Sequence, residues 1–590
     1  MITRKEALKE YTWDLTPFFA KEEDFYKEVA EIEASLSTVA VFEGKIGESF
    51  DSFKNALDTY FAMMERIEKA SVYAFMYFSQ DGGDTEAQKV RATVHSATVK
   101  AMTVSAFFEP EILSIPKEKI DEYMKNDSVK VYTQYINDLQ RGKLHTLDAD
   151  KEKLLAPLGE VSGTASDIYD AFCEVDMTFP KIKDSKGNEI ELSHGNFTAC
   201  RESTDRVLRE NAFNTFFGEY LKYNNTFSVM YSSHIKFDCY YSRVRGYKSA
   251  LEAGLFGSNV PTSVYDSLCS AIRDSLPTMR KYIDLRTKAL GKEKIDMFDL
   301  YTPMVEDVEY PMPYEDAKTL VKNALAPLGE EYAKLLDRAY NERWIDVYEN
   351  KGKSTGAYSI SAYGVHPYVL LNYTDTLDDA FTLAHELGHA MHSYYSNENQ
   401  EYPNHDYRLT VAEVASTVNE VLLTLYLLKT ETDKKRRAYI LNHFLEGFRT
   451  TVYRQTLFAE FERKAHEMHE SGIPLTAEAL NNLYKELIST YYEGAEINDI
   501  MKVEWSFIPH FYRSYYVYQY ATGFSSAVTI ANNIVNSGDA SNYLRFLSTG
   551  GSDYPLEELK IAGIDLTKPD TVASALSLFA KTVDELAEIL

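Results

Sequence analysis

Two histidines and a glutamate within five residues form the pattern best suited to chemistry. The segment His385-Glu386-Leu387-Gly388-His389 places two imidazoles four residues apart. In a helix they lie one turn apart and differ by about 40° around the axis, so both reach one cation. Glu386 lies about 60° from His389, where a carboxylate touches a water on the metal without ligating the metal. Zinc-dependent hydrolysis needs this division of roles.

The residues around this segment predict a helix independently of its chemistry. Asp375 and Thr376 suit the N-cap position, and Asp378 and Asp379 suit the first turn. Only 13 of the 590 residues are His, so this spacing around a Glu is improbable by chance. We therefore interpret the segment as a metal-binding helix.

A hydrolytic metal site needs a third protein ligand and an open position. One known scheme places a third His ten residues after the first and a Gly at the sixth. Tyr395 and Met391 occupy those positions here, which excludes that scheme. His392 lies two turns beyond His385 on the same face, and we interpret it as structural.

A carboxylate from a later helix is the other option for the third ligand. Glu413 lies near the start of the apolar segment TVAEVASTVNEVLLTLYLL. Thr410 and Glu413 also match a capping box, which is the competing interpretation. An acidic residue in so apolar a helix is expected to face a cation, and this favours the metal. Glu420, two turns on, is a second candidate, either as ligand or as a hydrogen-bond partner of one.

A second pair of histidines serves as an internal comparison. His466-Glu467-Met468-His469 has a spacing of three and lies within the charged run FERKAHEMHE. That pattern predicts a solvated helix and not a metal site.

Most of the chain shows the three- and four-residue spacing of helices. The first clear segments are 17–38, 49–80, 84–108 and 117–140. The segment 184–193 predicts a short hairpin that turns at Gly187-Asn188. We place a domain boundary there, which divides the chain into a helical N-terminal domain, 1–195, and a catalytic domain, 196–590.

A second non-helical stretch covers residues 352–373 and precedes the two-histidine segment. Pro367 followed by YVLLNY predicts a strand with Pro at its start. The extended segment His366–Tyr373 is expected to pair with a substrate backbone as an edge strand. The Gly- and Tyr-rich loop 352–364 is either a flap over a substrate or an ordinary hairpin tip.

The composition excludes several classes of partner. The chain has 62 basic and 90 acidic residues, a net charge of −28. This argues against binding to nucleic acid or to anionic lipid. No stretch reaches 18 apolar residues and the N-terminus lacks a signal-peptide core, so neither a membrane span nor export is expected. The four cysteines lack a C-x-x-C pair and are expected to be reduced thiols in a cytoplasmic protein.

HELGHAMH, followed 24 residues after its second His by the Glu of VAEVAST, resembles a known family. That family is the thimet-oligopeptidase-like zinc metallopeptidases. Within the family, the sequence most resembles the oligoendopeptidase F group. The resemblance extends along nearly the whole chain. It includes the stretches WDLTPFF, GKSTGAYS, HPYVLLNY, IPHFYRSYYVYQYATG and GGSDYPLEELKIAGID.

The resemblance implies a mostly α, large helical metallopeptidase fold whose two halves enclose a deep substrate channel. It also implies a small β-sheet next to the metal-binding helix. One zinc ion per chain is implied at His385, His389 and Glu413, with Glu386 as general base. The implied activity is hydrolysis of internal bonds in short, unstructured peptides.

The resemblance also implies that a late segment, residues 508–523, serves the reaction. His510 and Tyr515 match the family pattern well, and Tyr518 matches less closely because the spacing differs among its branches. The alternative for these residues is an aromatic stripe that packs the core.

Three alternatives stay open at this point, two of function and one of the metal. An exo-acting dipeptidyl carboxypeptidase or carboxypeptidase needs a cation for the substrate carboxylate, and Arg513 or Lys353 can supply it. A non-catalytic helical scaffold with a vestigial site does not explain Glu386 beside both histidines. Cobalt or manganese also accept two His and one Glu. The oligomeric state does not follow from the sequence.

Overall fold

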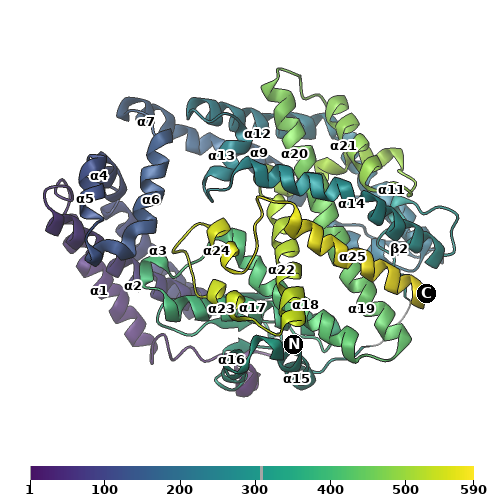
Figure 1. Cartoon of the computed structure of the whole chain (residues 1–590), viewed down its shortest axis with the longest axis horizontal. Coiled ribbons are helices and arrows are strands. Elements are labelled where there is room, and N and C mark those ends of the chain that lie inside the picture. The colour runs from purple at the N-terminus through teal and green to yellow at the C-terminus, as the bar shows by residue number, and fades with distance from the viewer. Residues whose placement is uncertain (1, 306–307, 309) are drawn as a thin grey trace. The chain divides into compact units, whose positions relative to one another are not determined.

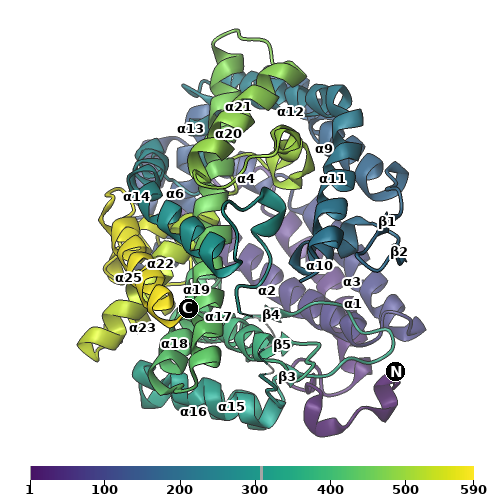
Figure 2. The same ribbon diagram turned by 90° about the vertical axis from the view of Figure 1, so that its right-hand side faces the viewer.

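The structure is a computed structural model that describes residues 2–305, 308 and 310–590 (Figures 1 and 2). It is mostly helical with two small sheets, which confirms the predicted α fold class. The chain forms two compact units, each assembled from three stretches of sequence. Unit 1 contains residues 1–144, 310–426 and 530–564, and unit 2 contains 145–309, 427–529 and 565–590. The predicted boundary at 195/196 divides the chain into two continuous stretches, whereas each of these units combines three. That boundary stays a prediction.

The first helices of unit 1 follow the predicted periodicity. They are α1 (Glu22–Ala40), α2 (Phe50–Gln80) and α3 (Thr85–Val104), with α4 (Phe108–Ser114) after them. The prediction of one helix over 117–140 was wrong, because α5 (Lys117–Tyr123) and α6 (Thr133–Gly142) are separate. Asn126 accepts a hydrogen bond from the Ser128 backbone N–H and starts a 3₁₀ turn between them. Asn is favoured there because its side chain competes with the helical backbone.

A three-stranded sheet in unit 1 lies close to the two-histidine segment. The strands are β3 (Ile345–Asp346), β4 (Tyr358–Ile360) and β5 (Tyr368–Leu370), in the order β3-β5-β4. β5 pairs in parallel with β3 and antiparallel with β4. The prediction that 366–373 forms an edge strand was therefore wrong, since β5 is central and every residue in it is buried. The two edge strands are β3 and β4, and β4 lies within the loop predicted at 352–364.

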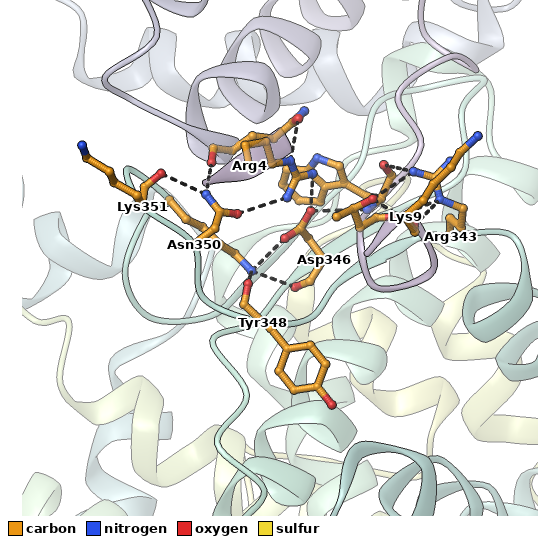
Figure 3. A network of polar contacts seen from close by, with 11 residues as sticks. Arg4, Lys9, Arg343, Asp346, Tyr348, Asn350 and Lys351 are labelled. Atoms are coloured by element: carbon orange, nitrogen blue, oxygen red, sulfur yellow. Dashed lines mark hydrogen bonds and ion pairs between the residues drawn. The ribbon is translucent and has the colours of Figure 1, made fainter. Parts of the chain in front are cut away.

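Asp346 ties β3 to two distant parts of unit 1. Its carboxylate pairs with Arg4 at 2.5 Å and with Lys353 at 2.8 Å. Lys353 also donates to the Tyr348 carbonyl at 2.8 Å, and its side chain is fully buried. Figure 3 shows Arg4 and Asn350 converging on this network around Asp346. The N-terminal segment and the turn before β4 are thus anchored to one buried carboxylate.

The other helices of unit 1 surround this sheet. They are α15 (Tyr314–Ala324), α16 (Glu330–Asn341), α17 (Leu377–Asn399), α18 (Leu409–Thr430), α23 (Ser541–Leu547) and α24 (Pro555–Ile561). α17 packs against β4, β5 and α15 (Figure 2). Among the residues described, α18 alone is long and apolar enough to span a membrane, but 72% of its most apolar window is buried. That burial is typical of a core helix.

Unit 2 is helical apart from one hairpin. The strands β1 (Ile182–Lys183) and β2 (Glu189–Ile190) pair antiparallel, and Gly187 has φ +83° in the turn, as predicted. The helices are α7 (Ala149–Leu155), α8 (Gly159–Ser162), α9 (Thr164–Asp170), α10 (His194–Glu202), α11 (Arg206–Lys222), α12 (Asn224–Val244), α13 (Ala250–Phe256), α14 (Thr262–Ala289), α19 (Lys434–Gly447), α20 (Arg454–Glu470), α21 (Ala477–Tyr491), α22 (Tyr518–Ser537, which ends in unit 1) and α25 (Asp570–Ile589). Two π-helical turns cover Ala171–Asp176 and Phe448–Tyr453.

All four cysteines lie in unit 2 and are free thiols. Cys173, Cys200 and Cys269 are buried, and Cys239 is partly exposed. Free thiols agree with the expectation that the chain lacks a disulfide framework.

We predict that Lys353→Met destabilises the protein by about 3 kcal/mol, because it leaves part of a buried carboxylate unpaired. The matched control is Lys351→Met, whose side chain is exposed two residues away and should change stability by less than about 0.5 kcal/mol. The urea midpoint of unfolding measures both. Equal midpoints for the two variants would show that the Asp346 network contributes little.

Candidate metal centre

The helix α17 begins as the sequence predicts. Asp379 donates its backbone N–H to the Thr376 hydroxyl at 3.2 Å, and its carboxylate accepts the Thr376 backbone N–H at 3.0 Å. This capping box satisfies N–H groups that lack partners within the helix. His385, Glu386 and His389 follow on the next turns, and all three are at least partly buried.

Gly388 allows α18 to approach α17 at backbone distance. A Cβ atom on Gly388 would lie 2.5 Å from Cα of Ser416 and 2.7 Å from the carbonyl oxygen of Ala415. Real Cβ atoms do not tolerate such distances, and a backbone cannot rotate away as a side chain can. The close approach brings the first turns of α18, with Glu413, beside the two histidines.

Three ligand atoms converge where the helices meet. The Nε2 atoms of His385 and His389 lie 3.2 Å apart. Oε2 of Glu413 lies 3.5 Å from the first and 3.7 Å from the second. Ligands about 2.0–2.2 Å from a tetrahedral zinc ion lie about 3.3–3.6 Å apart. Among the described residues, these three alone form a cluster able to hold a metal ion.

The position of Thr410 decides the open question about Glu413. A capping box requires Thr410 to precede the helix, but α18 begins at Leu409 and contains Thr410 in its first turn. The Glu413 carboxylate instead faces the histidines and accepts a hydrogen bond from the Ser416 hydroxyl at 3.2 Å. The geometry therefore favours the metal interpretation.

Glu420 orients one of the two histidines. Its Oε1 lies 2.5 Å from Nδ1 of His385. Because a carboxylate accepts, Nδ1 carries the proton and Nε2 is directed toward Glu413 and His389. Of the two roles considered for Glu420, the structure favours that of hydrogen-bond partner of His385.

Burial and neighbouring charge shift the pKa values in this cluster. Burial disfavours protonation of His385, but its hydrogen bond to Glu420 and the nearby carboxylates outweigh it and raise the pKa to about 9. Burial and the charge of His385 lower the pKa of His389 to about 3. Metal binding would therefore compete with protonation of His385.

Glu386 is placed between the histidines and the sheet. Its side chain is 7% exposed, and burial raises the pKa of its carboxyl to about 7. The backbone N–H of Ser359 in β4 donates to this carboxylate. A carboxyl with a pKa near neutrality is well suited to take and return a proton.

His392 is structural, as interpreted from the sequence. It is fully buried, and its ring stacks on Tyr407 at 3.6 Å between centroids. Phe546 packs on the same ring at 5.4 Å. Its place among aromatic rings, and its absence from the ligand cluster, agree with the two-turn offset from His385.

The late segment belongs to unit 2, and its three predicted residues differ in exposure. His510 is exposed, whereas Tyr515 and Tyr518 are each 2% exposed. Both tyrosine rings pack near Tyr265, with centroids 6.1 and 5.4 Å away. Tyr515 has φ +56°, a left-handed conformation that bulky residues rarely adopt.

Two helices of unit 2 hold Tyr515 in that conformation. Its backbone N–H donates to Glu462 at 2.7 Å, and its ring packs 4.9 Å from His466. The preceding Ser514 donates its hydroxyl to Asp238, which also lies 3.2 Å from His466 Nε2. A Cβ on Gly254 would lie 2.6 Å from the Tyr515 ring, so the ring needs a glycine beside it.

The prediction of a solvated helix for His466–His469 was wrong for its first residue. His466 is 1% exposed and pairs with Asp238, whereas Glu467 is exposed. Nδ1 of His466 donates to the Glu462 carbonyl at 2.9 Å. The charged run FERKAHEMHE gives no sign of this buried face, because the partner Asp238 comes from a helix more than 200 residues earlier.

Two tyrosines that the sequence reasoning did not single out lie beside His510. Tyr516 and Tyr520 are half-exposed, and their ring centroids lie 6.0 and 5.9 Å from that of His510. The Tyr520 hydroxyl lies 3.5 Å from Nε2 of His510. The four-residue spacing of Tyr516 and Tyr520 was the available signal for a shared face.

Comparison with known proteins identifies the family. A model of Peptidase family M3 matches residues 199–578, and a model described as Oligopeptidase F matches 111–179. The chain belongs to peptidase family M3. It is therefore a metallopeptidase, a hydrolase that acts on peptide bonds.

This M3 peptidase has close relatives in several bacteria. It is 42% identical to oligopeptidase PepF of Bacillus subtilis (strain 168), over 100% of this chain and 88% of the relative. It is 38% identical to an oligoendopeptidase F homolog of Lactococcus lactis subsp. lactis (strain IL1403), over 100% and 98%. The solved oligoendopeptidase-F of Enterococcus faecium is 36% identical with a TM-score of 0.74, covering 96% of this chain and 99% of that one. These findings confirm the family suggested by the sequence motifs.

We predict that Gly388→Ala in this M3 peptidase weakens metal binding at least tenfold. The added methyl group must push α18 away from α17, and overpacking of this kind costs about 1–3 kcal/mol. That exceeds the roughly 1 kcal/mol that Ala gains over Gly in helix propensity. Metal content after dialysis against graded chelator measures the effect.

The control for this variant is Gly218→Ala, because Gly218 lies within α11 with open space around its Cβ position. That variant should keep its metal. Undiminished metal affinity in Gly388→Ala would show that the helix contact does not set the ligand geometry.

Proposed function

We propose that this M3 peptidase is a zinc-dependent endopeptidase that hydrolyses internal bonds of short, unstructured peptides. The observation that supports this most directly is the convergence of two imidazoles and one carboxylate beside the buried Glu386. The names of the relatives, oligopeptidase and oligoendopeptidase, support the substrate class. The deep channel that the motifs imply, and a cytoplasmic location, stay predictions.

We assign one zinc ion per chain to His385, His389 and Glu413. Two neutral imidazoles and a carboxylate form a ligand set that zinc prefers, and their separations fit a tetrahedral ion with one open position. When bound there, zinc supplies a Lewis acid that lowers the pKa of water and polarises a carbonyl group. Cobalt and manganese stay alternatives that metal analysis distinguishes.

Glu386 acts as the general base in this proposal. It accepts a proton from the attacking water and later donates a proton to the leaving amine nitrogen. Its burial and its raised pKa support both transfers, since the carboxyl is then neither firmly charged nor firmly neutral. The hydrogen bond from Ser359 keeps its side chain in place.

The open edge of β4 is the proposed binding surface for the substrate backbone. One edge of β4 pairs with β5, and Ser359 in its middle reaches Glu386. An extended peptide added to the other edge would therefore pass beside the base. Main-chain hydrogen bonds give affinity with little dependence on side chains, which suits a peptidase of many short peptides.

The family resemblance, and not a measured distance, assigns the late segment to the reaction. His510, Tyr515 and Tyr518 stay the predicted donors to the developing oxyanion. Tyr520 joins them as a candidate, because its hydroxyl is accessible beside His510. One such donor is typically worth about 3 kcal/mol of transition-state stabilisation.

Exo-action is the alternative function, and it needs a cationic side chain that binds the substrate carboxylate. One of the two candidates for that side chain is not available. Lys353 is fully buried and paired with Asp346, so it is not available to a substrate carboxylate. Arg513 is exposed, with its guanidinium 4.2 Å from the centre of the Tyr516 ring. Arg513 therefore remains the candidate for an exo-acting relative.

We predict that Glu386→Gln lowers kcat by at least about 1,000-fold and retains zinc, because the amide cannot accept the proton. Glu413→Gln should instead lose zinc. The assay is cleavage of an internally quenched peptide of roughly ten residues, with zinc content measured on the same samples. Glu467→Gln is the control, since that exposed Glu lies in the other His-Glu-x-His run.

The same assay separates endo- from exo-action through its substrate. A C-terminal amide on the peptide should leave cleavage unchanged if action is internal and should abolish it if a carboxylate is recognised. Full activity of Glu386→Gln would refute the assigned base, and loss of cleavage with the amide would replace the endopeptidase with its runner-up.

The tyrosines are ranked by three single variants. We predict that Tyr520→Phe lowers kcat about 100-fold with zinc and thermal stability retained, because only an accessible hydroxyl is lost. Tyr515→Phe and Tyr518→Phe test the two buried hydroxyls in the same way. A loss of kcat confined to either buried tyrosine, at unchanged stability, would assign the donor role to that residue and not to Tyr520.

A further inference from the structure

A small cavity in unit 2 is lined by three arginines that have no role in the proposed reaction. Arg201 comes from the end of α10, Arg449 from the π-helical turn Phe448–Tyr453, and Arg454 begins α20. The cavity has a volume of about 10 Å³, close to the space that one water-sized occupant needs. Most of the remaining lining is aromatic or apolar.

The π-helical turn explains why two of these arginines share the cavity. Arg449 and Arg454 are five residues apart, which in an α-helix would separate their directions by about 140°. A π turn closes with bonds between residues five apart and so places them on one side. π turns are rare and occur often at functional sites.

Three buried donors around this cavity lack hydrogen-bond partners. They are Nη1 of Arg449, Nε of Arg201 and the hydroxyl of Tyr492. The exposed fractions of these residues are 0% for Arg449, 9% for Arg201 and 1% for Tyr492. A buried donor without a partner costs about 1–3 kcal/mol, and more when it is charged. Three such donors around one cavity indicate that the cavity holds a hydrogen-bond acceptor.

The charges of the described residues do not balance around the cavity. Glu446 accepts from Arg449 at 2.5 Å and also pairs with Arg286 at 3.1 Å. Glu504 pairs with Arg454 at 2.7 Å, and its other oxygen accepts from Tyr484 at 2.5 Å. Arg201 has no carboxylate partner in the part of the chain that the structure describes. Four guanidinium groups thus face two carboxylates.

The pKa of Tyr301 is shifted in the direction that an excess of positive charge produces. Its ring lies between two guanidinium groups, 3.9 Å from Arg201 and 4.3 Å from Arg449. Burial raises the pKa of its hydroxyl, but the arginines outweigh burial and lower that pKa to about 8. The surroundings therefore favour an additional negative charge.

We propose that this cavity binds a small monovalent inorganic anion, which in physiological solution is chloride. One anion supplies an acceptor for the three unpartnered donors and reduces the uncompensated charge from two to one. A water molecule satisfies the donors but leaves the charge unchanged. The site lies in unit 2 and requires nothing of the proposed zinc mechanism.

The direct test is a crystal of the full chain soaked in sodium bromide, with data collected at the bromine edge. An anomalous peak between Arg201, Arg449 and Tyr492 is the expected result. In solution, replacing sodium gluconate by sodium chloride at constant ionic strength should raise the Tm by about 3 °C or more. Tyr492→Phe and Arg201→Met should reduce this increase, and the exposed-site control Arg280→Met should keep it.

Two results would overturn the proposal. One is equal Tm values in chloride and gluconate together with density for water and no bromide peak. The other is an ionised Tyr301 at neutral pH, seen as tyrosinate absorbance that Tyr301→Phe removes, again with no bromide. In that case the phenolate would supply the missing negative charge.

Discussion

The contact between α17 and α18 at Gly388 determines the geometry of the metal centre. Two histidines on one helix can face a cation, but they supply only two ligands. In the proposed zinc site the third is Glu413 of α18, and its carboxylate reaches them because the two backbones touch where Gly388 lacks a side chain. The same approach brings Glu420, about two turns after Glu413, to His385. Ligands on two rigid helices also move less than ligands on loops.

The sheet supports this centre from the other side. β4 supplies a backbone donor to Glu386, and the turn before β4 is tied to β3 through Lys353 and Asp346. Burying these two charges costs desolvation free energy, and their mutual attraction and hydrogen bonds offset that cost only in this geometry. Glu386, the proposed base, is thus held next to a strand, and that strand follows a turn fixed by a buried ion pair that also binds the N-terminal segment.

Two of the failed predictions share one physical cause. The segment 366–373 looked like an edge strand, and His466 looked solvated. In each case the sequence pattern is local, whereas exposure depends on which distant segment packs there. β3 and β4 enclose β5, and Asp238 pairs with the buried His466.

The sequence by itself determined the features that follow from helix geometry and local chemistry. These are the start of α17 at Asp375 or Thr376, the shared face of His385 and His389, Glu386 on its flank, and the exclusion of the scheme with a third His. Tertiary structure decided what depends on contacts between remote segments. It made β5 the central strand and β4 an edge strand, buried Tyr515, and placed Thr410 inside α18, where it cannot form the capping box with Glu413. The reason is that backbone geometry sets angles within one helix, whereas only packing sets which faces of two elements meet.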